Sequence, residues 1–177
     1  KKTPYSEDDK VNPLSIYGLT KYEGEEFIRK TCDKYYIIRT SWLFGESTKE
    51  HGGGNFVERI LELSTQKENL SVVSDQIGSP TYTGDLVDII SKIINKIPEF
   101  GTYHFSGLDA CSWYDFAKEI LLQKNIKVDI KPITTNKYPQ KAKRPSYSYL
   151  DKTKIENTLN IKTRTWQEML TEYLAKR

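Results

Sequence analysis

Apolar residues recur along the chain with helical spacing in some segments and with the character of strands in others. Between Asp85 and Ile97 they fall at positions 86, 89, 90, 93, 94 and 97, which form one stripe of a helix that Pro98 ends. Further helices are predicted from Pro13 to about Thr31, from Asn55 to Leu63, from Ser112 to about Lys124 and from Thr165 through Leu174, with Asn12, Ser112 and Thr165 as caps. Short runs rich in strand-forming residues predict strands at residues 36–39, 70–73, 102–105 and 128–133.

The predicted helices and strands alternate, and this order indicates the fold class. Alternation is typical of parallel strands joined by crossover helices, so we expect an α/β fold. Dinucleotide-binding folds of this kind carry a glycine-rich turn after their first strand, but the chain has no G-x-G-x-x-G motif, and residues 52–54 follow a polar loop. The connection from Gly45 to Gly54 is interpreted as a mobile lid.

Composition and the isolated cysteines and histidines narrow the classes of function. Lysine and arginine total 27 against 24 acidic residues, and a net charge of +3 is too small to indicate a nucleic-acid surface. The aliphatic run Leu86–Ile97 is interrupted by polar residues, so no membrane span is predicted. Cys32 and Cys111 have no ligand spacing and are interpreted as buried thiols, and His51 and His104 as loop and core residues. We therefore expect no metal site, and a cytoplasmic location because neither end resembles a signal peptide.

Tyr17 and Lys21 lie four residues apart in the first predicted helix and therefore share one helix face. Reduction of a carbonyl by hydride requires a proton for the developing alkoxide, and a phenol beside an ammonium group, which stabilises the phenolate, can deliver it. Tyr114 and Lys118 form a second such pair, but large apolar neighbours indicate an anchoring helix there. Gly18 costs helix stability unless something packs closely, as a cofactor does. The alternative is an exposed helix pair without chemical role.

Several segments, in order along the chain, then resemble one enzyme family. The run P-Y-S-E-D-D-x-x-N-P-L-S-I-Y-G-L-T-K, from Pro4 to Lys21, is similar to the segment leading into the Y-x-x-x-K helix of extended short-chain dehydrogenases. The segments that resemble dTDP-4-dehydrorhamnose reductases more narrowly are Arg39-Thr40-Ser41-Trp42, Asn55-Phe56, Asp75-Gln76-x-Gly78-x-Pro80-Thr81, Ser112-Trp113-Tyr114-x-Phe116-Ala117 and Arg144-Pro145-x-x-Ser148-x-Leu150-Asp151. Together they cover nearly the whole chain.

The resemblance implies the C-terminal part of a Rossmann-like doubly wound parallel sheet plus a small α/β substrate-binding region. Residues 1–45 would carry the catalytic helix and the following strand, residues 46–177 mainly the substrate-binding region, and the N-terminal cofactor-binding half would be absent. The implied reaction is the NADPH- or NADH-dependent reduction of the 4-keto group of dTDP-4-dehydro-L-rhamnose to dTDP-L-rhamnose, and the isolated chain would be inactive. Tyr17 would donate the proton, and Lys21 would hold the nicotinamide ribose, so both would contact the cofactor.

The resemblance also implies three substrate contacts. Trp42 would pack on the sugar, with a core tryptophan as the alternative, while Asn55 at a helix start and Arg144 before a proline would contact the diphosphate. Residues 124–154 hold nine Lys or Arg and only two acids, which favours a dianionic nucleotide sugar, although a solvated lysine-rich face explains most of them equally well.

Two other functions stay open. An epimerase or dehydratase of nucleotide sugars shares the Tyr-Lys helix, although the segment Asp75–Thr81 favours a reductase. The regulatory subunit of methionine adenosyltransferase is a non-catalytic relative that works by binding a partner protein. The expected partner of this chain is a small nucleotide sugar, with neither nucleic acid nor membrane, and the sequence leaves open whether it forms a homodimer.

Overall fold

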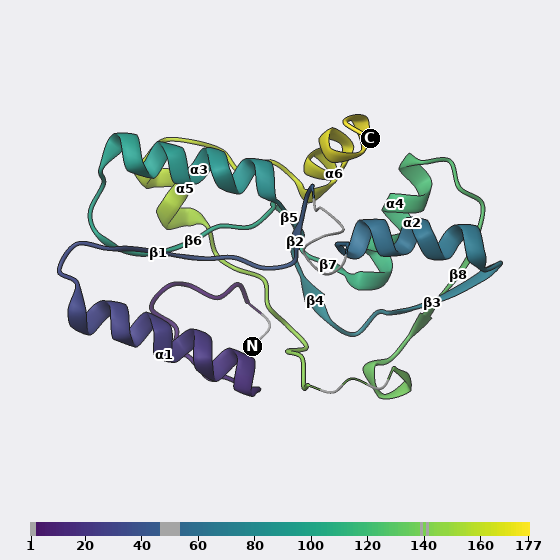
Figure 1. Ribbon diagram of the computed structural model, residues 1–177, viewed down its shortest axis with the longest axis horizontal. Coiled ribbons are helices and arrows are strands. Elements are labelled where there is room, and N and C mark those ends of the chain that lie inside the picture. The colour runs from purple at the N-terminus through teal and green to yellow at the C-terminus, as the bar shows by residue number, and fades with distance from the viewer. Residues whose placement is uncertain (1–2, 47–53, 139, 141) are drawn as a thin grey trace.

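Parallel strand pairs with helices on their faces make up the molecule (Figure 1). The computed structural model describes residues 3–46, 54–138, 140 and 142–177. Its helices are α1 (Ile16–Thr31), α2 (Phe56–Gln66), α3 (Thr83–Lys96), α4 (Trp113–Gln123), the 3-10 helix η2 (Thr135–Lys137), α5 (Thr153–Leu159) and α6 (Trp166–Ala175). Its strands are β1 (Tyr36–Arg39), β2 (Leu43–Phe44), β3 (Asn69–Val73), β4 (Ile77–Gly78), β5 (Thr81–Tyr82), β6 (Gly101–His104), β7 (Cys111–Ser112) and β8 (Asp129–Ile133).

The strand pairing confirms the α/β class and corrects one detail of it. The pairs β1–β6, β2–β5 and β3–β8 are parallel, as expected for strands joined by helices. The pair β4–β7 is antiparallel, and the described strands form four two-stranded pieces. The antiparallel pair was not predicted because strands of two residues carry no readable period.

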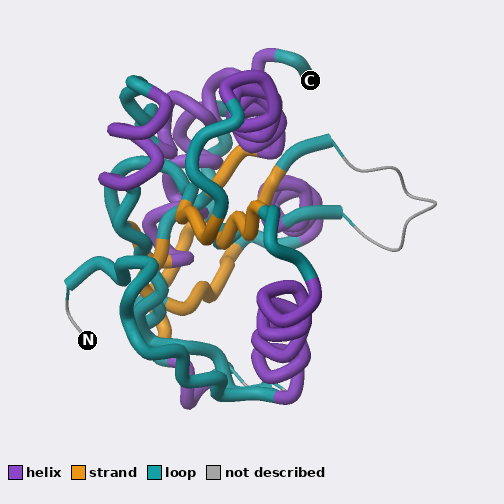
Figure 2. Tube along the Cα trace, turned by 90° about the vertical axis from the view of Figure 1, so that its left-hand side faces the viewer, coloured by secondary structure: helices purple, strands orange, loops and turns teal. Residues whose placement is uncertain are grey.

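Helices cover the two longer strand pairs in different ways. Helices α1 and α3 lie on opposite sides of β1–β6, and α2 and α4 pack against β3 and against each other (Figure 1). Helix α6 packs on β5 between these two regions, and the turned view in Figure 2 shows the strands inside a shell of helices and loops. The loops that leave the pairs β1–β6 and β3–β8 therefore meet in the region around β5 and α6.

One continuous apolar core runs through the described residues, and aromatic rings form its centre. The ring of Phe44 lies 5.5 Å from that of Phe116 and 5.6 Å from that of Tyr173, and Trp166 contacts Phe116 edge-on. Helix α1 is the exception, since none of its side chains is buried. It must therefore be attached by polar contacts.

Local signals explain most helix boundaries. Ser112 and Thr165 form capping boxes with Asp115 and Glu168, which confirms both predicted caps. The predicted start of α1 is wrong: Ser15, rather than Asn12, accepts a hydrogen bond from Gly18 N at 3.2 Å and begins the helix. Helix α5 was not predicted, because a seven-residue helix gives too little periodicity.

Candidate functional site

Trp42 lies just beyond the C-terminal end of β1, where ligands of parallel sheets gather. Its carbonyl oxygen accepts a hydrogen bond from Thr81 N at 3.1 Å, and Thr81 Oγ1 donates to Ser41 O at 2.7 Å. Ser41 Oγ in turn donates to Ser79 O at 2.9 Å. The half-buried indole stacks on Trp113 with ring centroids 3.6 Å apart and planes 8° apart. Two of the segments that resemble the reductase family thus contact Trp42: Thr81 through its backbone and Trp113 through its ring.

Strand β4 joins the remaining segments to Trp42. Ile77 N donates to Ser146 O and Ser148 N donates to Ile77 O, each at 2.8 Å, while Gly78 pairs with Cys111. A Cβ on Gly78 would lie 2.6 Å from an indole carbon of Trp42 and 2.7 Å from Ser148 Oγ. Gly78 is therefore required by close packing, and segments far apart in the sequence converge on one ring.

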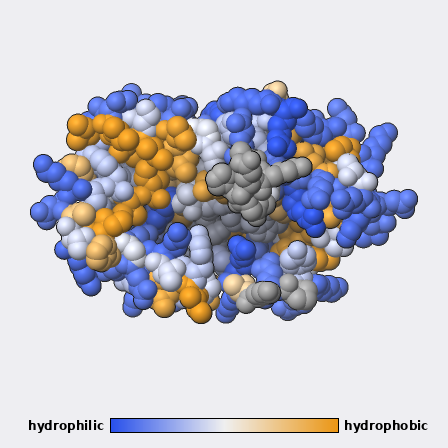
Figure 3. All heavy atoms as spheres, viewed as in Figure 1, coloured by the Kyte–Doolittle hydropathy of each residue, from blue (hydrophilic) through white to orange (hydrophobic). Residues whose placement is uncertain are grey.

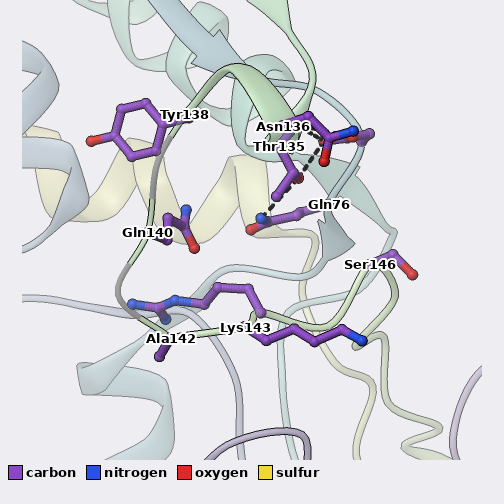
Figure 4. Close-up of a pocket in the computed structure, with 10 residues that line it drawn as sticks. Gln76, Thr135, Asn136, Tyr138, Gln140, Ala142, Lys143 and Ser146 are labelled. Carbon is purple, nitrogen blue, oxygen red and sulfur yellow. Dashed lines mark hydrogen bonds between the residues drawn. The ribbon is translucent and has the colours of Figure 1, made fainter.

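A cavity of about 390 Å³ opens beside this convergence, and its size is suited to a small ligand. Its lining residues are Asp75, Gln76, Thr135, Asn136, Tyr138, Gln140, Ala142, Lys143, Arg144 and Ser146. Asp75 accepts hydrogen bonds from Thr135 Oγ1 at 2.6 Å and from Thr135 N at 2.8 Å, and these bonds lower the pKa of Asp75. Gln76, 3% exposed, donates to Thr135 Oγ1 at 3.1 Å, and Figure 4 shows the loop with Tyr138, Gln140 and Lys143 closing the other side. The side chains of Asp75 and Gln76 thus hold Thr135, which lies 60 residues after Asp75, in the wall of the cavity.

Arg144 and Lys143 place two exposed cationic side chains on the cavity lining. Within the described part of the chain neither of them forms an ion pair, and the carboxylate of Asp75 is the acidic group in the same lining. A guanidinium group can bind a phosphate through two parallel hydrogen bonds. The position of Arg144 suits the predicted diphosphate contact, which stays a prediction.

Asn55 caps α2, and its side chain is occupied by the fold. Its Oδ1 accepts from Glu58 N at 3.2 Å, and its Nδ2 donates to Gly45 O at 2.6 Å and to Tyr173 Oη at 3.0 Å. All the hydrogen-bonding atoms of this amide are thereby used. A diphosphate contact at this position, still a prediction, would have to come from backbone N–H groups of the first turn.

Tyr17 and Lys21 lie together on α1 and belong neither to the Trp42–Trp113 stack nor to the cavity lining. The ammonium nitrogen of Lys21 is 5.5 Å from the centre of the Tyr17 ring, and Tyr17 is 71% exposed. Lys118 lies 5.6 Å from the Tyr114 ring in the second pair, but Tyr114 packs partly buried against the core on α4. Exposure, and not the geometry of the pair, distinguishes the two tyrosines.

The other titratable residues have structural surroundings. His104 is buried, and burial lowers its pKa. The guanidinium of Arg39 has no acceptor, so its Nη1 donates to His104 Nε2. The ring proton of His104 is therefore on Nδ1, which donates to Tyr5 O at 3.0 Å. Cys111 is buried as expected, and burial raises its pKa. Cys32 was also expected to be buried, but it is exposed because it lies at the end of α1, a helix with no buried side chain. His51, and most of the predicted lid at residues 45–54, lie outside the described residues.

Sequence reasoning missed two parts of this site. Trp113 was assigned to an anchoring helix, and the stack on Trp42 could not be foreseen because only tertiary structure brings the two rings together. Thr135 and Tyr138 gave no signal apart from lying in the lysine-rich segment. In the described part of the chain no three His, Cys, Asp or Glu residues form a group that could hold a metal ion, and no helix there is long and apolar enough to cross a membrane.

The parallel strand pairs with helices on their faces place the chain in the Rossmann-type α/β class, and the Trp42–Trp113 stack at a strand end with the adjacent cavity is its candidate site. The model of one family, the RmlD substrate binding domain, matches residues 1–177. The chain belongs to this family.

Relatives and solved structures agree with that assignment. The chain is 47% identical to the spore coat polysaccharide biosynthesis protein SpsK of Bacillus subtilis over 98% of its length, and 42% identical to a dTDP-4-dehydrorhamnose reductase of Aggregatibacter actinomycetemcomitans over 96%. It spans 59% and 60% of those proteins. A crystal structure of a dTDP-4-dehydrorhamnose reductase from Clostridium acetobutylicum superposes with a TM-score of 0.92 at 44% identity, covering 99% of this chain and 60% of that one. The Bacillus anthracis enzyme, solved in complex with NADP, gives 0.88 at 39% identity, covering 98% and 59%.

Proposed function

We propose that this chain is the substrate-binding part, with half of the catalytic apparatus, of an NADPH-dependent reductase that converts dTDP-4-dehydro-L-rhamnose to dTDP-L-rhamnose. The relatives named for this reaction, the cationic cavity and the exposed Tyr17–Lys21 pair support the proposal. The substrate would lie with its diphosphate near Arg144 and its sugar against Trp42.

The observation that carries the proposal is the exposure of Tyr17 beside the ammonium group of Lys21. A general acid must reach the reacting oxygen, and Tyr17, a residue that is 71% exposed and lies beside an ammonium group, has that access. Tyr17 would deliver its proton to O4 of the sugar, and the charge of Lys21 would stabilise the phenolate that is left. Tyr114 is partly buried against the core and is therefore less accessible than Tyr17.

The same pair fits a nicotinamide cofactor. The ammonium group of Lys21 is exposed on the side of Tyr17 and can donate to ribose hydroxyl groups, so both side chains would hold the cofactor as well as act on the sugar. When bound, NADPH supplies the hydride for the keto carbon. The phosphate-binding glycines for such a cofactor are expected on a preceding part of the protein.

Exposed apolar side chains support a separate cofactor-binding part, beside the proposed division of the chain into residues 1–45 and 46–177. On α1, Ile16 and Phe27 are exposed. On α3, Val87 and Ile94 are exposed, as is Ile97 at the C-terminal cap, and Figure 3 shows an apolar area over this helix. Apolar areas of this kind mark surfaces that bind another structure. We propose that the cofactor-binding part covers these faces of α1 and α3.

The test is the reaction itself. A complete protein, with the cofactor-binding part joined to this chain, is expected to oxidise NADPH when the keto sugar is added, whereas the 177-residue chain alone should neither do so nor bind NADPH at micromolar concentration. A complete, folded protein that leaves NADPH unchanged and co-purifies with methionine adenosyltransferase would instead establish the regulatory alternative. A cytoplasmic location stays a prediction, and whether the protein forms a homodimer stays open.

A further inference from the structure

Trp42 has a backbone conformation that is unusual for a bulky residue. Its φ is 48°, in the left-handed region that glycine and asparagine tolerate and that large side chains rarely adopt. Strain of this kind persists where the surroundings impose it, and it clusters at ligand-binding positions. The hydrogen bond from Thr81 N to Trp42 O and the bond from Thr81 Oγ1 to Ser41 O hold the backbone in this state. The orientation of the indole is thus imposed by its neighbours.

The neighbour on the face of the ring is Trp113. Ring centroids 3.6 Å apart and planes within 8° describe nearly face-to-face rings, whereas free aromatic pairs prefer offset or edge-on arrangements. The stack is therefore enforced from outside. Phe56 lies 4.5 Å from the Trp113 ring and supports it from α2.

Trp113 is itself fixed by the strand that confines Trp42. It is the first residue of α4 and directly follows Ser112, which forms a capping box with Asp115 and pairs with Ile77 of β4. The next residue of β4, Gly78, abuts the edge of the Trp42 ring. Strand β4 thus positions both groups that confine the Trp42 indole: the Trp113 ring on its face and Gly78 at its edge. These two contacts form a slot around the indole.

We propose that Trp113 is a positioning residue that holds the Trp42 indole in the orientation in which it receives the sugar of a nucleotide-sugar substrate; this inference rests on the proposed function. Trp113 acts through Trp42 and does not contact the substrate. Loss of the stack lets the indole of Trp42 turn in its slot. Binding of the sugar is then weakened, while binding of the nucleotide alone is not.

The stack can be measured in the 177-residue chain. Two indoles this close give a pair of circular dichroism bands of opposite sign in the far ultraviolet. Trp42→Phe and Trp113→Leu should both abolish that pair of bands, and Trp166→Phe, which removes the remaining tryptophan from the core, should retain it. Retention of the bands in Trp113→Leu would overturn the inference.

The positioning role is tested by calorimetric titration of the same chain with dTDP and with dTDP-L-rhamnose. Trp113→Leu should weaken binding of dTDP-L-rhamnose about tenfold and change dTDP binding less than about twofold, and Trp113→Phe, which keeps a ring, should restore most of the sugar affinity. Equal losses for both ligands would show a general structural defect and overturn the inference, as would unchanged affinity for dTDP-L-rhamnose. A wild-type chain that gains nothing from the sugar would contradict the proposed function itself, and this inference with it.

Discussion

The carboxylate of Glu25 on α1 forms two parallel hydrogen bonds with the guanidinium of Arg39 on β1, from Nε to Oε1 at 2.8 Å and from Nη2 to Oε2 at 2.6 Å. Arg29 joins the same carboxylate at 2.8 Å and donates to Thr102 Oγ1 on β6. Since α1 buries no side chain, these polar contacts hold the helix that carries Tyr17 against the strands. The position of the proposed catalytic pair therefore depends on an ion pair two turns away.

We expect Glu25→Gln to loosen α1. Loss of a partly buried, two-pronged ion pair should cost about 1–2 kcal/mol of unfolding free energy and increase amide hydrogen exchange in α1 more than in α4. Glu62→Gln is the matched control, because its ion pair with Arg59 on α2 is more than half exposed and should contribute little. Equal effects of both substitutions would contradict the role given to Glu25.

The pH dependence of stability should report the same contact. Burial alone raises the pKa of Glu25, but hydrogen bonds and charges from Arg39 and Arg29 outweigh it and hold the pKa below its ordinary 4.5. A depressed carboxyl pKa contributes stability that is complete above the unfolded value and is lost as the pH falls through the folded value. The difference in unfolding free energy between wild type and Glu25→Gln should therefore shrink below about pH 4.5, measured by urea denaturation.

Two tyrosines with lysines four residues on allow a direct comparison in the complete protein. Tyr17→Phe keeps the ring and deletes the hydroxyl, so it should lower kcat by about 10²–10⁴-fold, the range for a lost general acid. Tyr114→Phe should change kcat by less than about threefold, because that ring packs on the core. NADPH oxidation with the keto sugar, after melting curves establish folding, measures both. An inactive but folded Tyr114→Phe would reverse the assignment.

Arg144→Ala should impair recognition of the nucleotide sugar in the complete protein. The lost charged hydrogen bonds correspond to about 1.5–3 kcal/mol in kcat/KM, mainly through KM for the sugar nucleotide. Arg59→Ala on the exposed face of α2 is the control and should leave both KM values unchanged. A rise confined to KM for NADPH would place Arg144 at the cofactor instead.

Gly78→Ala and Gly24→Ala should change stability in opposite directions. At Gly78 the added methyl meets the Trp42 ring and Ser148, so we expect a loss of about 1–3 kcal/mol from overpacking. At Gly24, within α1, nothing lies within 4 Å, and alanine should stabilise by about 0.5–1 kcal/mol. Thermal and urea unfolding of the 177-residue chain measures both. A neutral Gly78→Ala would show that the contact with Trp42 is loose.

Lys152 should make stability rise with pH in the alkaline range. Its ammonium group is buried over the Tyr149 ring and donates to Leu150 O at 2.8 Å, and burial lowers its pKa from 10.5 to about 8. Between these values the unfolded chain binds more protons than the folded one, so the unfolding free energy increases from about pH 8 toward pH 10.5.

Lys152→Met should remove this increase. Lys154→Met is the control, because Lys154 is exposed although it too donates to a backbone carbonyl and lies over a tyrosine ring. Urea denaturation at several pH values decides the matter. An increase that persists in Lys152→Met would assign it to another group.

Local sequence was sufficient for the longer elements and for the Tyr17–Lys21 pair. Periodicity over ten or more residues located α3, α4 and α6, and the side chains of Ser112 and Thr165 marked helix starts, because these signals act within one or two turns. The pairing of Tyr17 with Lys21 also follows from helix geometry alone. The resemblance of ordered segments was sufficient to indicate the family that the comparisons bear out.

Tertiary structure alone decided which residues meet. The stack of Trp42 on Trp113, the clamp of Asp75 on Thr135 and the bond of Glu25 to Arg39 join residues whose separation in sequence carries no record of their distance in space. The very short strands β4 and β7, and the helix α5, lie below the length at which a pattern can be recognised. Burial differs between Tyr17 and Tyr114 in the direction that the large apolar neighbours of Tyr114 had indicated, since Tyr114 packs against the core and Tyr17 is exposed.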